Sequence, residues 1–250
     1  MAAVVRLIEG LGTPESTWRA WNGLAALDTL DLHPPSARAV VVAPHPDDEV
    51  LGVGGTLTLL TTAGVSVRVV AVTDGEASHP HSPTRTPAAL AEIRRAEQHL
   101  ALARLGLDQA QVVRCGLPDG DLKRHEADLA DTLTGLLDEH TWCLATWAYD
   151  GHPDHESAGR AAARAASATG ARLLAFPVWA WHWARPADSR VPWRTARRVP
   201  LPAAVARAKR HAVRAFASQL EPLSAQPGDE AIIGPSAVAR LTRDYEVILL

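Results

Sequence analysis

Two short clusters of histidine and aspartate are the part of this 250-residue sequence best suited to chemistry. The first reads Pro-His-Pro-Asp-Asp-Glu and includes His45 and Asp48. The second reads His-Pro-Asp-His and runs from His152 to His155. A turn can bring two side chains three residues apart to the same point, and imidazole and carboxylate groups are ligands that a catalytic zinc ion uses. Together the two clusters predict a metal site.

Each cluster follows a segment that is expected to be a buried strand. Residues 39–43 read Ala-Val-Val-Val-Ala, an apolar run without alternation that is typical of a strand covered on both faces. A similar run, residues 142–146, ends shortly before the second cluster. Ligands of α/β proteins bind beyond the carboxyl ends of the parallel strands. We therefore expect the two clusters to meet at one edge of a sheet.

The central sequence continues as alternating strands and helices. The expected strands are 39–43, 65–72, 111–114, 142–146 and 173–176. The expected helices are 54–63, 87–105, 129–137, 156–169 and, later, 203–219. Strands joined by helices of this length need right-handed crossovers and a mostly parallel sheet with helices on both faces. The predicted fold class is therefore α/β, with a Rossmann-like sheet.

We expect one domain with an addition at each end of the sequence. An N-terminal helical extension covers residues 1–36 and contains a short helix that is capped by Thr13 and ends near Leu27. The main domain covers residues 37–220. The pattern loosens late in the chain, so residues 221–250 are expected to form an irregular C-terminal extension packed on that domain.

Metal-dependent hydrolysis needs ligands, a base for the water proton and a donor for the developing oxyanion. Asp47 is the candidate base, and His152 is the candidate donor, oriented by Asp154. The candidate metal ligands are His45, Asp48 and His155. Zinc is the metal expected for two histidines and one carboxylate, and Fe²⁺ suits the same set. Proline and aspartate also favour ordinary turns, but two such clusters at predicted strand ends favour the metal site.

At these residues the sequence resembles the LmbE-like, or N-acetylglucosaminyl-phosphatidylinositol deacetylase (PIG-L), family. The leading motif of the family appears here as residues 43–49, and its second motif as residues 152–155. At the level of pattern, the resemblance covers roughly residues 38–220 and includes Thr73-Asp-Gly-Glu76. It implies a deacetylase domain with a Rossmann-like sheet. It also implies a divalent metal, usually zinc, on the three candidate ligands, with the base and oxyanion donor named above.

The resemblance further implies that Arg94 and Asp119 contact a sugar. Arg94 could instead form an ion pair with Glu97, three residues later on the expected helix. Some relatives carry a mobile tyrosine two residues before the histidine that matches His152. Asp150 stands at that position, next to Tyr149, so the role of that tyrosine does not transfer.

The function expected from these residues is N-deacetylation of an N-acetylglucosamine-type conjugate, such as a thiol-cofactor precursor or a natural-product glycoside. A zinc amidase that hydrolyses a non-sugar or thiol-conjugate amide is the alternative enzyme. An inactive carbohydrate-binding protein is the non-enzymatic alternative. The Trp179–Trp183 segment could stack on sugar rings or belong to the core or an interface, and the sequence leaves this open.

Charge and hydropathy restrict the partners. A net charge of −3 gives no positive field that would attract nucleic acid or anionic lipid. No segment approaches the roughly 18 apolar residues that span a bilayer, and the apolar start of the sequence is too short for a signal peptide. Cys115 and Cys143 are expected to be buried thiols in a reducing cytoplasm. We therefore expect a cytoplasmic protein with a small amino-sugar substrate; a homo-oligomer is left open.

Overall fold

The computed structural model describes residues 7–32 and 38–250, and a seven-stranded sheet forms its centre. The strands are β1 (Arg38–Ala43), β2 (Ser66–Ala71), β3 (Gln111–Arg114), β4 (Thr141–Thr146), β5 (Arg172–Phe176), β6 (Ala196–Pro200) and β7 (Tyr245–Leu249). Their order is β3-β2-β1-β4-β5-β7-β6. The first five strands are parallel, and β7 runs antiparallel to both of its neighbours. The predicted α/β class with a mostly parallel sheet is confirmed.

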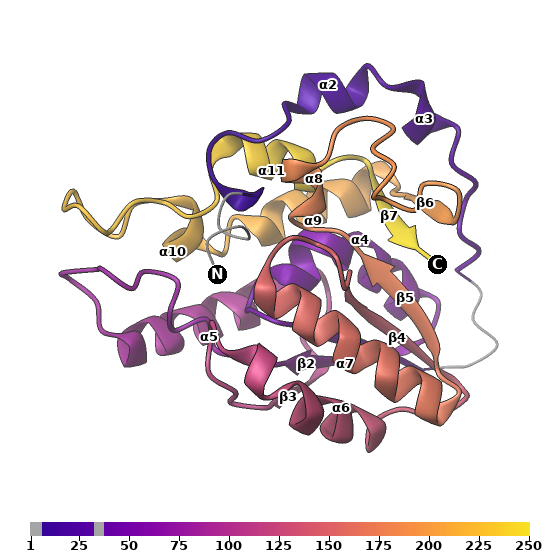
Figure 1. Ribbon diagram of the computed structural model, residues 1–250, viewed down its shortest axis with the longest axis horizontal. Coiled ribbons are helices and arrows are strands. Elements are labelled where there is room, and N and C mark those ends of the chain that lie inside the picture. Colours follow the sequence, from indigo (N-terminus) through magenta and orange to yellow (C-terminus); the bar gives the residue numbers. More distant parts are fainter. Residues whose placement is uncertain (1–6, 33–37) are drawn as a thin grey trace.

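Helices cover both faces of the sheet (Figure 1). The helices are α2 (Glu15–Arg19), α3 (Asn22–Ala25), α4 (Asp48–Thr62), α5 (Pro87–Arg104), α6 (Glu126–Thr134), α7 (Pro153–Thr169), α8 (Ala180–Trp183), α9 (Ala203–Val213), α10 (Ala217–Leu220) and α11 (Pro235–Leu241), with a 3₁₀ turn, η1, at Leu122–Arg124. α6 and α7 pack on one face, and α4, α5 and α9 form the layer on the other. Among the described residues, no helix has the length and apolar character needed to cross a membrane.

The side chains of β1 explain why its sequence is apolar without alternation. Val41 packs into the layer that contains α4, whereas Val40 and Val42 pack into the layer that contains α7. All three are buried. A strand covered on both faces buries every side chain, so consecutive valines are the pattern that such a strand requires.

Each strand predicted from the sequence is present, with its ends displaced by at most one residue. β6 and β7 were not predicted. β6 lies in a stretch rich in proline and arginine, and β7 lies in the part of the chain expected to be irregular. β7 nevertheless lies between β5 and β6, so residues 245–249 belong to the sheet. The predicted boundary between residues 36 and 37 lies outside the described residues.

Four of the predicted helices differ clearly from the prediction, and one of them is α7, which begins at Pro153 and not at Glu156. α4 begins at Asp48, not near Gly54, because its glycines serve packing and do not delay the helix. A Cβ atom on Gly52 would lie 2.2 Å from the Phe176 ring, and one on Gly55 would lie 2.5 Å from Leu201. α6 lies three residues earlier than the predicted 129–137, and the predicted helix over 203–219 is divided into α9 and α10.

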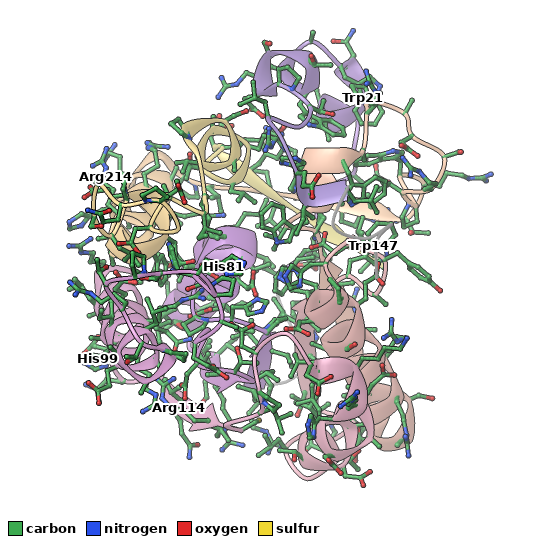
Figure 2. All side chains as sticks on the ribbon, turned by 60° about the vertical axis from the view of Figure 1, so that its left-hand side comes forward. Trp21, His81, His99, Arg114, Trp147 and Arg214 are labelled. Carbon is green, nitrogen blue, oxygen red and sulfur yellow. The ribbon has the colours of Figure 1, made fainter. Side chains whose placement is uncertain are left out.

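The N-terminal helices pack on the domain through aromatic side chains. Trp18 meets Trp181 edge to face at 5.1 Å between ring centroids, and Trp21 meets Trp193 in the same way at 4.9 Å. Figure 2 shows Trp21 in these elements at the top of the view. Thr13 does not cap α2, which begins at Glu15; its hydroxyl donates to the carbonyl of Ala184 at 2.6 Å. These contacts join α2 and α3 to the segment around α8.

A buried ion pair joins the C-terminal strand to the helices. Lys209 on α9 donates to Glu246 on β7 at 2.6 Å and to the carbonyl of Leu51 at 2.8 Å. Glu246 also accepts from the N–H groups of Gly55 and Thr56 and from the Thr56 hydroxyl. Because both charges are buried and hydrogen-bonded, α4, α9 and β7 depend on one another at this point.

Replacing Lys209 with methionine should lower the free energy of unfolding by about 3–5 kcal/mol, because the Glu246 carboxylate would stay buried without its ammonium partner. Urea denaturation measures this loss. The double variant Lys209→Met/Glu246→Gln should recover part of it, because it also removes the uncompensated charge. Lys123→Met, at an exposed lysine, is the control and should change stability by less than about 0.5 kcal/mol. Equal losses in Lys209→Met and the control would contradict this role.

Candidate functional site

The two histidine clusters meet where the strand order changes direction. From β1 the chain continues to β2 and β3 on one side, whereas β4 and β5 lie on the other side. The loop after β1 carries His45; after β4, His152 is the N-cap of α7 and His155 lies in its first turn. Crevices at such switch points are the usual ligand sites of open α/β sheets. The predicted meeting of the two clusters is therefore a direct result of the sheet topology.

His45, Asp48 and His155 offer one ligand atom each within 4.8 Å of one another. Asp48 is at the first turn of α4, and its Oδ2 lies 3.2 Å from His45 Nδ1 and 3.2 Å from His155 Nε2. The backbone N–H of His45 also donates to this carboxylate at 3.0 Å. The side chains predicted to be ligands therefore converge on one point.

Asp150 determines which nitrogen of His155 faces that point. Its carboxylate, which has no exposed surface, lies 2.8 Å from His155 Nδ1. An ionised carboxylate can only accept a hydrogen bond, so the proton between the two atoms belongs to Nδ1. The same carboxylate accepts hydrogen bonds from the N–H groups of Val178, Trp179 and Ala180 after β5. Neutral His155 therefore carries its proton on Nδ1, and the lone pair of Nε2 faces Asp48.

This arrangement places two hydrogen-bond acceptors opposite each other. Within the described part of the chain, His155 Nε2 has no hydrogen-bond partner, although Asp48 Oδ2 is close. An imidazole lone pair and a carboxylate oxygen at this distance need a proton or a metal cation between them. The residues present therefore fit a divalent metal, and the unpartnered nitrogen is the observation that tests this fit.

The pKa values of the three candidate ligands also show that this point favours positive charge. Burial works to lower the pKa of His155, but the Asp48 and Asp150 carboxylates raise it to about 9. Burial likewise opposes protonation of His45, yet Asp119, Asp154 and Asp48 raise its pKa well above the usual value. The pKa of Asp48 stays far below its usual range despite burial, because His155 and His45 stabilise its charge.

Asp47 lies beside this group and pairs with Arg94. Arg94 Nη2 lies 3.1 Å from Asp47 Oδ2, and Arg94 also donates to the carbonyl oxygens of Gly75 and Pro46. A Cβ atom on Gly75 would lie 2.1 Å from Arg94, so glycine is required where the guanidinium passes. Burial raises the pKa of Asp47 to about 7, although Arg94 works in the opposite direction. A carboxylate with such a pKa suits proton transfer near neutral pH.

His152 is the N-cap residue of α7, and its Nδ1 accepts the backbone N–H of Asp154 at 3.2 Å. Burial and the neighbouring His155 and His45 lower the pKa of His152 to about 3, so the ring is neutral at neutral pH. With Nδ1 acting as acceptor, the single ring proton lies on Nε2. His152 can therefore donate a hydrogen bond from Nε2 toward the site.

Asp154 contacts His152 through its backbone, and its carboxylate has other partners. It accepts hydrogen bonds from the N–H groups of Gly120 and Leu122, at 2.7 and 3.2 Å, and lies 3.4 Å from His45 Nε2. His45, His152 and Asp154 form a second group that could hold a metal. In that group His152 Nδ1 and both oxygens of Asp154 already have partners, so the group with His155 is the better candidate.

The remaining predicted residues lie close by. Asp119 Oδ1 lies 3.1 Å from His45 Nε2, and its Oδ2 accepts the N–H of Ala77 at 2.8 Å. Glu97, the alternative partner expected for Arg94, instead accepts hydrogen bonds from the N–H and hydroxyl of Ser218. Seven of the eight predicted site residues line one cavity of about 460 Å³; Asp154 lies behind it. Figure 2 shows His99, by contrast, on the outer surface of α5.

The Trp179–Trp183 segment has several roles. The Trp179 ring lines the cavity and stacks beside His152 at 6.4 Å between centroids. Trp181 belongs to the aromatic cluster of the N-terminal helices, and Trp183 donates to the carbonyl of Asp150 at 2.7 Å. Sequence reasoning missed the role of Asp150, whose only local signal is its position two residues before the second cluster.

Comparisons with known proteins agree with this geometry. Residues 40–166 match the family described as GlcNAc-PI de-N-acetylase (PIG-L). A probable N-acetyl-alpha-D-glucosaminyl L-malate deacetylase 2 of Bacillus cereus is 31% identical over 134 residues, which are 51% of this chain and 60% of that protein. Diacetylchitobiose deacetylase of Thermococcus kodakarensis is 29% identical over 126 residues, covering 49% of this chain and 46% of the relative.

A solved structure extends the similarity over most of the fold. A conserved protein of Thermus thermophilus is 28% identical, with a TM-score of 0.60, and the alignment covers 85% of this chain and 93% of that one. The chain thus spans about half to three fifths of the length of the two curated relatives named above.

Replacing Asp150 with asparagine should weaken divalent-metal affinity by about 10–100-fold. The amide of asparagine has one acceptor oxygen, so it cannot reproduce every hydrogen bond of the carboxylate or hold the His155 proton on Nδ1. Competition with a chromophoric chelator measures the affinity, and an unfolding curve shows whether the variant is folded. Asp138→Asn, before β4 and so at its opposite end, is the control. Unchanged metal affinity in folded Asp150→Asn protein would contradict this assignment.

Proposed function

The chain belongs to the GlcNAc-PI de-N-acetylase (PIG-L) family, and on this basis we propose that it is a metal-dependent deacetylase of N-acetylglucosamine-type conjugates. One observation carries the proposal: a convergent His45, Asp48 and His155 group lies beside Asp47 and His152 in one cavity. The names of the two curated relatives, both deacetylases of N-acetylated sugars, support the reaction class.

The three convergent residues would hold the metal. Zinc bound there would polarise the amide carbonyl and lower the pKa of a water molecule, and Fe²⁺ suits the same donors. The His155 lone pair is already directed to this position by Asp150, and Asp48 supplies a charged oxygen. Because Asp48 and Asp150 raise the pKa of His155 to about 9, metal binding would displace a proton from His155 Nε2.

Asp47 is the proposed general base. Its carboxylate would accept a proton from the attacking water as the C–O bond forms, and would then give that proton to the amine nitrogen as the C–N bond breaks. The products are acetate and the free amine, and the base is returned to its starting state. Arg94 keeps Asp47 in place at 3.1 Å, and the raised pKa of Asp47, about 7, suits both accepting and returning a proton.

His152 is the proposed donor to the carbonyl oxygen. As negative charge develops on that oxygen, a hydrogen bond from His152 Nε2–H becomes stronger and lowers the barrier. The backbone N–H of Asp154 holds the opposite nitrogen, so the proton is already on the required side. We propose that Asp154 acts through this bond and through the N–H groups of Gly120 and Leu122.

Arg94 and Asp119 are the proposed sugar contacts. Both line the cavity on the side of His45 and Asp47, and buried Arg94 Nε has no partner among the described residues. An amidase that acts on a non-sugar or thiol-conjugate amide would use the same reacting groups. An inactive carbohydrate-binding protein would bind the conjugate without turnover. The identity of the released amine distinguishes the first two functions, and the absence of any release identifies the third.

Removal of the metal tests the reaction class. Incubation with a panel of N-acetylglucosaminyl compounds should release acetate and a free amino sugar. A strong chelator should abolish this release, and zinc added back should restore it, because the proposed ligands hold the metal reversibly at the edge of a folded sheet. Release of acetate that persists after complete removal of the metal would contradict the metal-dependent mechanism.

Replacing Asp47 with asparagine should lower kcat by about 10²–10⁴-fold, because the amide cannot accept the water proton. Metal content should stay close to one ion per chain, since Asp47 is not among the proposed ligands. Steady-state kinetics and elemental analysis measure the two quantities. Asp74→Asn, after β2, is a matched control, because Asp74 pairs with Arg95 and Arg114 and does not line the cavity. Turnover by Asp47→Asn at the parent rate would rule out Asp47 as the base.

A further inference from the structure

The cavity that contains the candidate metal site extends well beyond it. At one end are the imidazole and carboxylate groups described above, and the rest of the wall is mainly apolar. We name as the apolar wall the residues Leu51, Val178, Trp179, Ile232, Ile233 and Leu241. The total volume is about 460 Å³, within the range of cavities that hold a small organic ligand. The apolar wall has no part in the proposed chemistry.

Most of this wall comes from parts of the chain outside the family match. Val178 and Trp179 follow β5, and Leu241 ends α11. The N–H groups of Ile232 and Ile233 both donate to the carbonyl of Gln219, at 3.0 and 2.8 Å, which fixes their backbone against α10. Only Leu51 lies within residues 40–166. The wall is therefore a feature of this chain and not of the matched motif.

The position of the wall relative to the reacting groups shows which part of a substrate it would contact. Trp179 stacks beside His152, the proposed donor to the carbonyl oxygen, and Leu51 lies one helical turn after Asp48. The proposed amine and sugar contacts, Asp47 and Arg94, pair with each other on the other flank. With the carbonyl oxygen at His152 and the amide nitrogen at Asp47, the third substituent of the carbonyl carbon, the acyl chain, would lie toward Trp179 and Leu51.

An acetyl group would use little of this surface. Its apolar part is a single methyl group, whereas the wall presents six apolar side chains, one of them a tryptophan. Apolar surface left in contact with water is unfavourable, and its burial scales with the area covered. We propose that the apolar wall is an acyl subsite that accepts a linear N-acyl chain longer than acetyl. This inference rests on the proposed amide hydrolysis at the adjacent site.

The test is a series of glucosamine amides carrying acetyl, butanoyl, hexanoyl and octanoyl groups, with release of the same free amine from every member. Each methylene that becomes buried should raise kcat/KM by up to about fourfold. Octanoyl glucosamine should therefore exceed the acetyl compound by at least about tenfold. A parallel pair, the methyl and octyl glycosides of N-acetylglucosamine, keeps the acetyl group and lengthens the other side of the molecule.

A charged substitution in the wall provides the second arm. Ile232, which is 42% exposed, can be changed to aspartate without placing a charge in the core. Ile232→Asp should lower the ratio of octanoyl to acetyl kcat/KM by about tenfold, because the chain would then lie against a carboxylate. Leu100→Asp, at a leucine 45% exposed on α5 and outside the cavity lining, is the matched control and should leave the ratio unchanged.

The outcomes separate this proposal from the proposed function. Hydrolysis of the acetyl compound with no gain from longer acyl chains would overturn the acyl subsite and leave the deacetylase standing. A preference for the octyl glycoside alone would overturn it in favour of an apolar aglycone. If no amide is hydrolysed, the proposed function fails. Calorimetric titration of the metal-loaded protein with octanoate and with acetate then tests whether the apolar wall binds an acyl chain. Octanoate binding no tighter than acetate would then overturn the subsite.

Discussion

The candidate metal site depends on how four buried aspartates around it are neutralised: Asp47, Asp48, Asp150 and Asp154. Three of these carboxylates are stabilised by groups of the chain itself. Asp47 pairs with the guanidinium of Arg94, and Asp150 and Asp154 accept hydrogen bonds from backbone N–H groups. Asp48 faces His155 Nε2, and the proton of neutral His155 is directed away by Asp150. When His155 is neutral, the negative charge of Asp48 is therefore left without a positive partner at this point. A metal ion at that point would complete the electrostatics of the surrounding loops.

The composition of this site could be predicted from the sequence because its central residues are local. His45 and Asp48, or His152 and His155, are close along the chain, and the buried strands before them indicate where both clusters lie. The contacts that orient these side chains are different in kind. Asp150 meets backbone groups 28 to 30 residues later, and Arg94 meets Asp47 across 47 residues. No spacing in the sequence signals contacts of this range.

The fold shows the same division. β1 and β4 could be recognised because burial on both faces leaves a nearly uninterrupted apolar run. β6 and β7 escape recognition because charged residues interrupt their sequences. Arg197 and Arg198 lie in β6, and Glu246 of β7 is buried only because Lys209 pairs with it. The start of α4 was misplaced for a related reason. Its glycines weaken helix propensity, yet each is selected by a close neighbour, such as Phe176 against Gly52.

The reacting groups and the apolar wall lie in different parts of the chain. The proposed ligands, base and oxyanion donor all lie within residues 40–166, the part that matches the family. Most of the apolar wall lies after residue 166, in segments held in place by long-range contacts such as those of Gln219 with Ile232 and Ile233. Two chains could therefore share every reacting group and differ in substrate through changes in these segments alone. Since a motif records only the reacting groups, the substrate of such a protein has to be argued from its cavity wall.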